Sequence, residues 1–68
     1  MADISEQVGQ LIREARQKKG LTQPELAERL GVTKGAVSAY ETGKQNLTLG
    51  TLQKVAVALD IPLKITLG

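Results

Sequence analysis

The stretch of residues 22–43, TQPELAERLGVTKGAVSAYETG, constrains the fold of this chain more than any other segment. Thr22 and Glu25 have the spacing of a capping box, in which the hydroxyl and the carboxylate satisfy free backbone N–H groups at a helix start. A helix is therefore predicted over residues 23–30. Gly31 follows directly, at the position where a left-handed residue ends a helix without steric cost.

A second helix follows after a turn of only three residues. Thr33 can cap it, and Gly43 can end it after about Glu41. Two helices joined so closely must cross sharply, which leaves the outer face of the second one exposed. We expect Val37 and Tyr40 to face inward. The predicted outer face is short, small and polar, and it consists of Lys34, Gly35, Ser38, Ala39 and Thr42.

The segments on either side also have helical periodicity. Apolar residues between Ile4 and Ala15 recur at helical spacings and predict an amphipathic helix that runs to about Lys18. Asp3 or Ser5 can cap this helix. A fourth helix is predicted from the cap Thr48 to about Asp60, because Pro62 disfavours helical geometry at the residue before it. Its apolar face consists of Leu52, Val55, Ala56 and Leu59.

After Asp60 the apolar pattern alternates with period two, which is typical of a half-buried strand. The apolar positions are Ile61, Leu63, Ile65 and Leu67. No other stretch offers a partner strand, so pairing with the same strand of a second copy is the simplest way to satisfy its backbone groups. The alternative is a tail that lays Ile61 and Leu63 on the helices.

A chain of 68 residues has room for one domain, here residues 1–68, and an aliphatic core suits a small helical bundle. The predicted fold class is therefore all-α, with four main helices and a short C-terminal β-strand at residues 61–67. Tyr40 is the only aromatic residue among the 41% of hydrophobic residues.

Composition excludes several function classes. Histidine and cysteine are absent, which removes the usual general base, the usual nucleophile pairings and most transition-metal ligands. We therefore expect no catalytic residues, no metal and no cofactor. No apolar stretch approaches the roughly 20 residues of a membrane helix, and the first residues, MADISEQV, contain no cationic start followed by the apolar run typical of a signal peptide. A cytoplasmic protein without a membrane partner is expected.

The net charge of +2 is weak support for a nucleic-acid partner. Basic residues cluster near the end of the first helix and flank the second half of the central stretch, and a solvated charged surface explains these clusters equally well. Function must therefore be inferred from the motif.

The positions of Ala27 and Gly31, with apolar residues at Leu26, Leu30, Val32, Val37 and Tyr40, resemble the helix-turn-helix pattern of the lambda-repressor and Cro-like family, often called XRE-type regulators. The resemblance covers about residues 8–59, and its most recognisable run is LTQPELAERLGVTKGAVSAYETGK. It implies a lambda-repressor-like DNA-binding domain of prokaryotic, phage or plasmid type, with the helix-turn-helix at about residues 22–42.

The resemblance also implies which residues contact double-stranded DNA. The helix that begins near Thr33 would enter the major groove, and the helix before it would lie across the backbone. The base-facing residues would be Thr33, Lys34, Gly35, Ser38 and Ala39, with Gly35 giving clearance more than contact. The phosphate-binding residues would be Thr22, Gln23, Lys44, Gln45 and Asn46. Arg16 and Glu41 match positions that form a salt bridge, with a structural role ahead of DNA contact.

The end of the chain departs from the phage repressors, which have a fifth helix there. The run NLTLGTLQKVAVALDIPLKITL looks more like antitoxins in which such a domain precedes a dimerising strand, here Ile61, Leu63, Ile65 and Leu67. Two functions follow from the resemblance. The first is a sequence-specific transcriptional regulator that acts as a homodimer on an inverted repeat. The alternative is an antitoxin that binds a toxin protein and autoregulates its operon.

Overall fold

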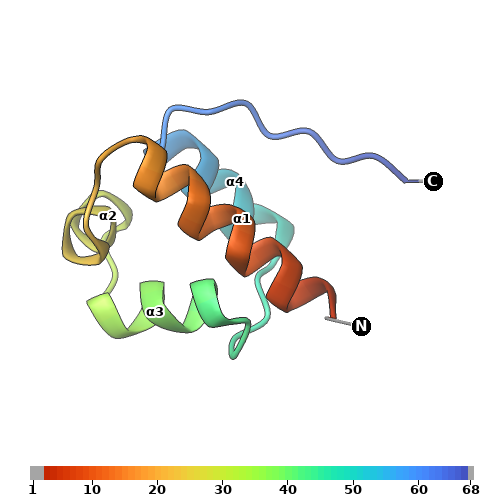
Figure 1. The fold of residues 1–68 in the computed structure, drawn as a ribbon, viewed down its shortest axis with the longest axis horizontal. Coiled ribbons are helices and arrows are strands. Elements are labelled where there is room, and N and C mark those ends of the chain that lie inside the picture. The colour runs from red at the N-terminus through yellow and green to blue at the C-terminus, as the bar shows by residue number, and fades with distance from the viewer. Residues whose placement is uncertain (1–2, 68) are drawn as a thin grey trace.

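The computed structural model describes residues 3–67, which form four helices and no strand. They are α1 (Ile4–Lys18), α2 (Gln23–Leu30), α3 (Lys34–Thr42) and α4 (Leu49–Ala58). α3 packs against α1 and α2, and α2 also packs against α4. Figure 1 shows α3 at the bottom of the molecule and the C-terminal tail above α1 and α4. The predicted all-helical fold is confirmed.

Each helix begins at a side chain that accepts a hydrogen bond from a backbone N–H three residues later. The four caps are Asp3, Thr22, Thr33 and Thr48. Asp3, and not Ser5, caps α1, because the Ser5 hydroxyl instead donates to Asn46 Oδ1 at 2.7 Å. The three threonine caps were all predicted from spacing alone.

The helices end in left-handed residues. Gly31 and Gly43 have φ values of 70° and 76°, as the sequence predicts for residues that end α2 and α3. Asp60 fills the same role after α4 with φ 55°, and it is the only residue other than glycine with positive φ in the described part of the chain. α4 ends at Ala58, slightly before the end predicted near Asp60.

The core lies where the four helices meet. Leu26 and Val37 are completely buried, and Tyr40 packs beside them as expected. The buried hydrophobic residues are Ile12, Leu26, Ala27, Val37, Tyr40, Val55, Ala56 and Leu59. The apolar face of α1 is only partly covered, because Ile4 and Leu11 are 70% and 63% exposed.

The tail after Asp60 is extended, but it is not a strand in the single chain. Ile61 packs on the core, whereas Leu63, Ile65 and Leu67 are exposed. A strand needs a hydrogen-bonded partner, and no backbone hydrogen bond joins residues 62–67 to the rest of the described chain. The part of the prediction that concerns pairing across a dimer stays a prediction. None of the four described helices is long and apolar enough to cross a membrane.

α1 crosses α3 at very short range. A Cβ atom placed on Gly9 would lie 2.6 Å from the Glu41 carbonyl oxygen and closer still to the Tyr40 carbonyl oxygen. Gly43, just after α3, also lies close to α1, since its Cβ would lie 2.8 Å from Glu6 Cα. Backbone therefore meets backbone at this crossing, and only glycine fits at both positions.

A buried ion pair joins the same two helices. Arg16 Nε lies 2.6 Å from Glu41 Oε2, and Arg16 Nη2 donates to Glu41 Oε1 at 3.1 Å. The side chains are 10% and 2% exposed. Arg16 Nη1 also donates to the Leu21 carbonyl at 2.8 Å, so one guanidinium joins α1, α3 and the turn between α1 and α2. Hydrogen bonding to Glu41 raises the pKa of Arg16 against the opposing effect of burial, so Arg16 keeps its charge.

We predict that Gly9→Ala lowers the free energy of unfolding by about 3 kcal/mol, because the new methyl group meets main-chain atoms that cannot rotate away. Urea unfolding followed by circular dichroism measures the change. Gly50→Ala is the matched control in α4, since its Cβ would lie 3.9 Å from Thr48 Oγ1, an ordinary van der Waals distance. That variant should gain up to about 1 kcal/mol from helix propensity. Equal effects at the two sites would contradict the close crossing.

We predict that Arg16→Met lowers the free energy of unfolding by about 3–5 kcal/mol, because the Glu41 carboxylate is left buried without its cation. The double variant Arg16→Met/Glu41→Leu should lose less than Arg16→Met alone, since no unpaired charge remains. Denaturant midpoints of the single and double variants measure both effects. Losses that simply add would show that the two side chains act independently.

Candidate nucleic-acid interface

The N-terminal half of α3 presents a short outward face. Thr33, Lys34 and Gly35 are exposed, and Ser38 and Ala39 are half-buried. The opposite side of α3 carries the buried Val37 and Tyr40. The helix is therefore held by its inner side while its first turns stay open to a partner.

Two hydroxyl groups on this face already form hydrogen bonds to the backbone of α3. Thr33 Oγ1 accepts a hydrogen bond from the Ala36 N–H at 3.1 Å, which leaves its own O–H free to donate. Thr42 Oγ1 donates to the Ser38 carbonyl at 3.0 Å, so this hydroxyl is turned back onto its own helix. Of the outer-face residues, Lys34 carries the only side-chain charge.

The start of α2 lies beside the end of α3. Gln23 Nε2 donates to Glu41 Oε1 at 3.1 Å, and Glu41 is the residue that Arg16 neutralises. An amide nitrogen has two N–H groups, so one remains for a second acceptor. The sequence singled out Gln23 and Glu41 separately, and their contact across 18 positions was missed because no local spacing encodes it.

Thr22 and Glu25 form the predicted capping box at the same helix start. The Thr22 backbone N–H donates to Glu25 Oε1 at 2.9 Å, and the Glu25 N–H donates to Thr22 Oγ1 at 3.2 Å. The backbone hydrogen bond from Thr22 is the largest cause that lowers the pKa of the Glu25 carboxyl below its usual 4.5. A lowered pKa means that this support of α2 is complete at neutral pH and is lost as pH falls through the folded-state pKa.

The loop after α3 supplies the remaining predicted phosphate contacts. Lys44, Gln45 and Asn46 are all exposed. Asn46 Oδ1 accepts the hydrogen bond from Ser5, so its NH₂ group is the part left to donate to a partner. The Gln23–Glu41 hydrogen bond thus brings the start of α2 to the C-terminal end of α3, which the loop follows directly, while Lys34 is the first residue of α3.

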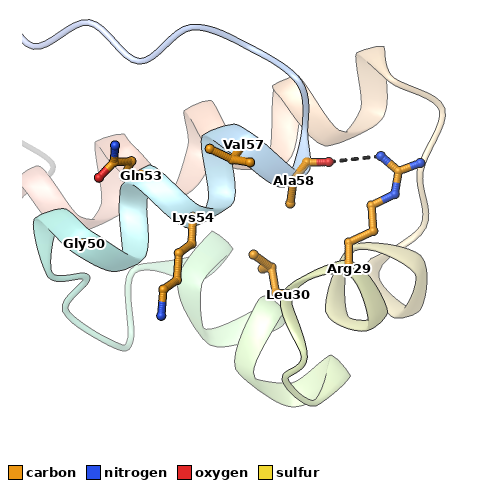
Figure 2. A pocket seen from close by; sticks show the side chains of 7 residues that line it. All are labelled: Arg29, Leu30, Gly50, Gln53, Lys54, Val57 and Ala58. Atoms are coloured by element: carbon orange, nitrogen blue, oxygen red, sulfur yellow. Dashed lines mark hydrogen bonds between the residues drawn. The ribbon is translucent and has the colours of Figure 1, made fainter.

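A groove outside this surface contains none of the predicted site residues. It has a volume of about 470 Å³ between α2 and α4, and Figure 2 shows Arg29 and Lys54 at its edges. Arg29 Nη1 donates to the Ala58 carbonyl at 3.0 Å and so ties the end of α2 to the end of α4. A basic residue in the last turn of a helix was the available sequence signal for this tie.

Comparison with known proteins identifies the family to which this chain belongs. A family model described as helix-turn-helix matches residues 12–65. An HTH-type transcriptional regulator of Methanothermobacter thermautotrophicus is 49% identical over 49 residues, which is 72% of this chain and 71% of that protein. The chain spans 31–45% of three longer HTH-type regulators that it also matches.

Two further relatives have informative names. The restriction-modification controller protein C.AhdI from Aeromonas hydrophila superimposes with a TM-score of 0.79 at 40% identity, covering 84% of this chain and 86% of C.AhdI. Antitoxin HipB of Escherichia coli is 30% identical over 59 residues, which is 87% of this chain and 67% of HipB. A HipA–HipB–O2–O3 complex superimposes on 97% of this chain and 93% of the matched chain, with a TM-score of 0.76 at 27% identity. The chain therefore belongs to the helix-turn-helix family, in the XRE-type branch that its central stretch resembles.

Proposed function

We propose that this chain is a sequence-specific transcriptional regulator that binds double-stranded DNA with α3 in the major groove. The observation that carries the proposal is the division of α3 into a fully packed inner side and an exposed N-terminal half. Recognition helices of this motif contact base edges with their N-terminal residues. The names of its relatives as transcriptional regulators support the same function.

The proposed base contacts come from small side chains. Lys34 can donate to the O6 and N7 atoms of guanine, and the methyl groups of Thr33 and Ala39 can touch the methyl group of thymine. Ser38 can serve as a short donor or acceptor, and Gly35 gives clearance for the groove wall. Few strong donors face the bases, so part of the specificity should come from DNA shape.

The proposed phosphate contacts surround the other end of α3. Gln23 would donate its second amide N–H to a phosphate, and the start of α2 adds backbone donors and a favourable dipole. Thr22 belongs to the same helix start. Lys44, Gln45 and the free amide of Asn46 would bind the backbone from the loop. The ion pair of Glu41 with Arg16 matters here, because it removes a negative charge next to the phosphates.

We infer that two copies act together on an inverted repeat, joined through the tail. Antiparallel pairing of two tails satisfies the backbone groups that residues 62–67 leave without partners within the described chain. Pairing centred on Ile65 would place Lys64 across from Thr66 and so avoid facing lysines. The apolar side chains at positions 61, 63, 65 and 67 would then lie on one face of the pair.

The likeness to HipB favours a second candidate function. HipB is an antitoxin, and the matched structure is a complex of HipA, HipB, O2 and O3. An antitoxin role for this chain would add a toxin protein as a partner and make DNA binding a form of autoregulation. Stable co-purification with the product of a neighbouring gene would support this role, and isolation of the chain alone after co-expression would count against it.

We predict that Lys34→Gln weakens binding to the preferred DNA site by about 1–3 kcal/mol and relaxes the base preference at one position. Fluorescence anisotropy on sites selected from a random library measures both effects across a salt series. Lys54→Gln is the charge-matched control in the α2–α4 groove of Figure 2, and it should change affinity little. Wild-type binding that shows neither salt dependence nor sequence preference would refute the proposed function.

We predict that Ile65→Lys converts the protein to a monomer and weakens binding to the inverted repeat more than to a single half-site. The charge would lie in the proposed strand pair, where burial of an unpaired ammonium is unfavourable. Ile65→Val, which keeps an apolar strand-forming residue, should remain dimeric. Sedimentation equilibrium decides between them, and an unchanged dimer in Ile65→Lys would remove the tail from the interface.

A further inference from the structure

Most of the exposed large hydrophobic side chains share one face of the molecule. Eight such side chains are exposed among residues 3–67, and seven of them line three neighbouring grooves. The exception is Val32, in the turn between α2 and α3. The seven residues form what we call the apolar face: Ile4, Leu11, Leu49, Val57, Leu63, Ile65 and Leu67.

The three grooves are continuous because they share a wall. Ile65 lines all of them. One groove, of about 330 Å³, lies between α1, α4 and the tail and includes Ile4 and Leu11. The second runs along α4 past Leu49 and Val57, and the third joins the start of α1 to the start of α4. The apolar face therefore spans two helices and the tail.

Six of the seven side chains of the apolar face are more than half exposed. Leu49 and Val57 are 72% and 74% exposed, which is similar to the exposure of Ile4 and Leu11 on α1. Monomeric proteins rarely leave contiguous apolar patches of this kind open to water, because their burial in an interface is favourable. Figure 1 shows the tail on the side of α1 and α4 that lies away from α3, so a partner that covers the tail leaves α3 itself free. The groove between the starts of α1 and α4 extends to Gln45 in the loop after α3, so the edge of the apolar face lies next to the proposed phosphate contacts.

We propose that a second copy of this chain covers the apolar face, so that α1 lies inside the dimer interface together with α4 and the tail. The proposal rests on the dimeric regulator proposed above and extends its interface from the tail to Ile4 and Leu11. Contacts from three segments would fix the angle between two copies, which a pair of tails alone would leave loose. The spacing of the two α3 helices would then be set by α1 and α4.

Two observations favour a second copy over another kind of partner. The face is continuous with the tail, whose unpaired backbone suits a two-fold contact with its own counterpart. It is also almost without charge, since Lys64 is the only charged residue that lines any of the three grooves. Depletion of charge is typical of the core of an interface between identical chains.

A substitution on α1 tests the proposal without touching the tail. Leu11→Glu should raise the dimer dissociation constant by about tenfold or more, as expected for a charged residue in a buried apolar contact. Helix content should not change, because Leu11 is mostly exposed in the single chain. Glu14→Gln is the matched control, since Glu14 is exposed on the same helix and lines a polar groove instead. Sedimentation equilibrium and circular dichroism provide the two readouts.

Thiol labelling gives an independent readout, because the chain has no cysteine of its own. In Leu11→Cys, reaction with a thiol reagent should slow as protein concentration rises through the dimerisation range. In Glu14→Cys, the rate should not depend on concentration. Equal, concentration-independent rates at the two positions would overturn the proposal, as would a wild-type protein that stays monomeric at every concentration tested.

The outcomes also separate this proposal from the proposed function. If Ile65→Lys is monomeric while Leu11→Glu dimerises like the wild type, the interface is confined to the tail and α1 is outside it. The dimeric regulator would then stand without the wider interface. If Leu11→Glu loses the dimer but still binds a half-site in a salt-dependent way, the interface includes α1 and DNA binding is independent of it.

Discussion

The close crossing of α1 over α3 is the contact on which the rest of the structure depends. Gly9 and Gly43 let backbone touch backbone there, and the Arg16–Glu41 ion pair fixes the two helices a short distance away. Because α3 has only nine residues, it would be marginal as an isolated helix. The helices that α3 packs against must therefore stabilise its conformation and fix its orientation. Its outward N-terminal half can contact DNA as proposed only because its inner side is fixed in this way.

The same ion pair connects the scaffold with the proposed DNA contacts. Glu41 accepts hydrogen bonds from Arg16 on α1 and from Gln23 at the start of α2, so one carboxylate joins three helices. A carboxylate near phosphates would be unfavourable if it were free, and the guanidinium compensates for it. Arg16 thus pairs with the buried Glu41 carboxylate and, in the proposed DNA complex, offsets its negative charge near the phosphates.

The side of the molecule away from α3 is apolar where α3 is polar. α3 offers few, small and polar contacts, whereas α1, α4 and the tail leave a continuous apolar face exposed. A single copy with such a limited reading surface gains specificity when a second copy is held at a fixed distance, because the two half-sites are then read together. The apolar face and the outward face of α3 are therefore complementary parts of one proposed mechanism.

Local chemistry in the sequence was enough to predict the four helices, since caps such as Thr22 and ends such as Gly31 depend on residues only a few positions apart. The inward positions of Val37 and Tyr40 also followed from periodicity. Three features depended on tertiary structure: the close approach at Gly9, the contact of Gln23 with Glu41, and the exposure of Leu11 beside the buried Ile12. Periodicity shows which side of a helix is apolar, but what covers that side is decided by helix packing between residues far apart in the chain.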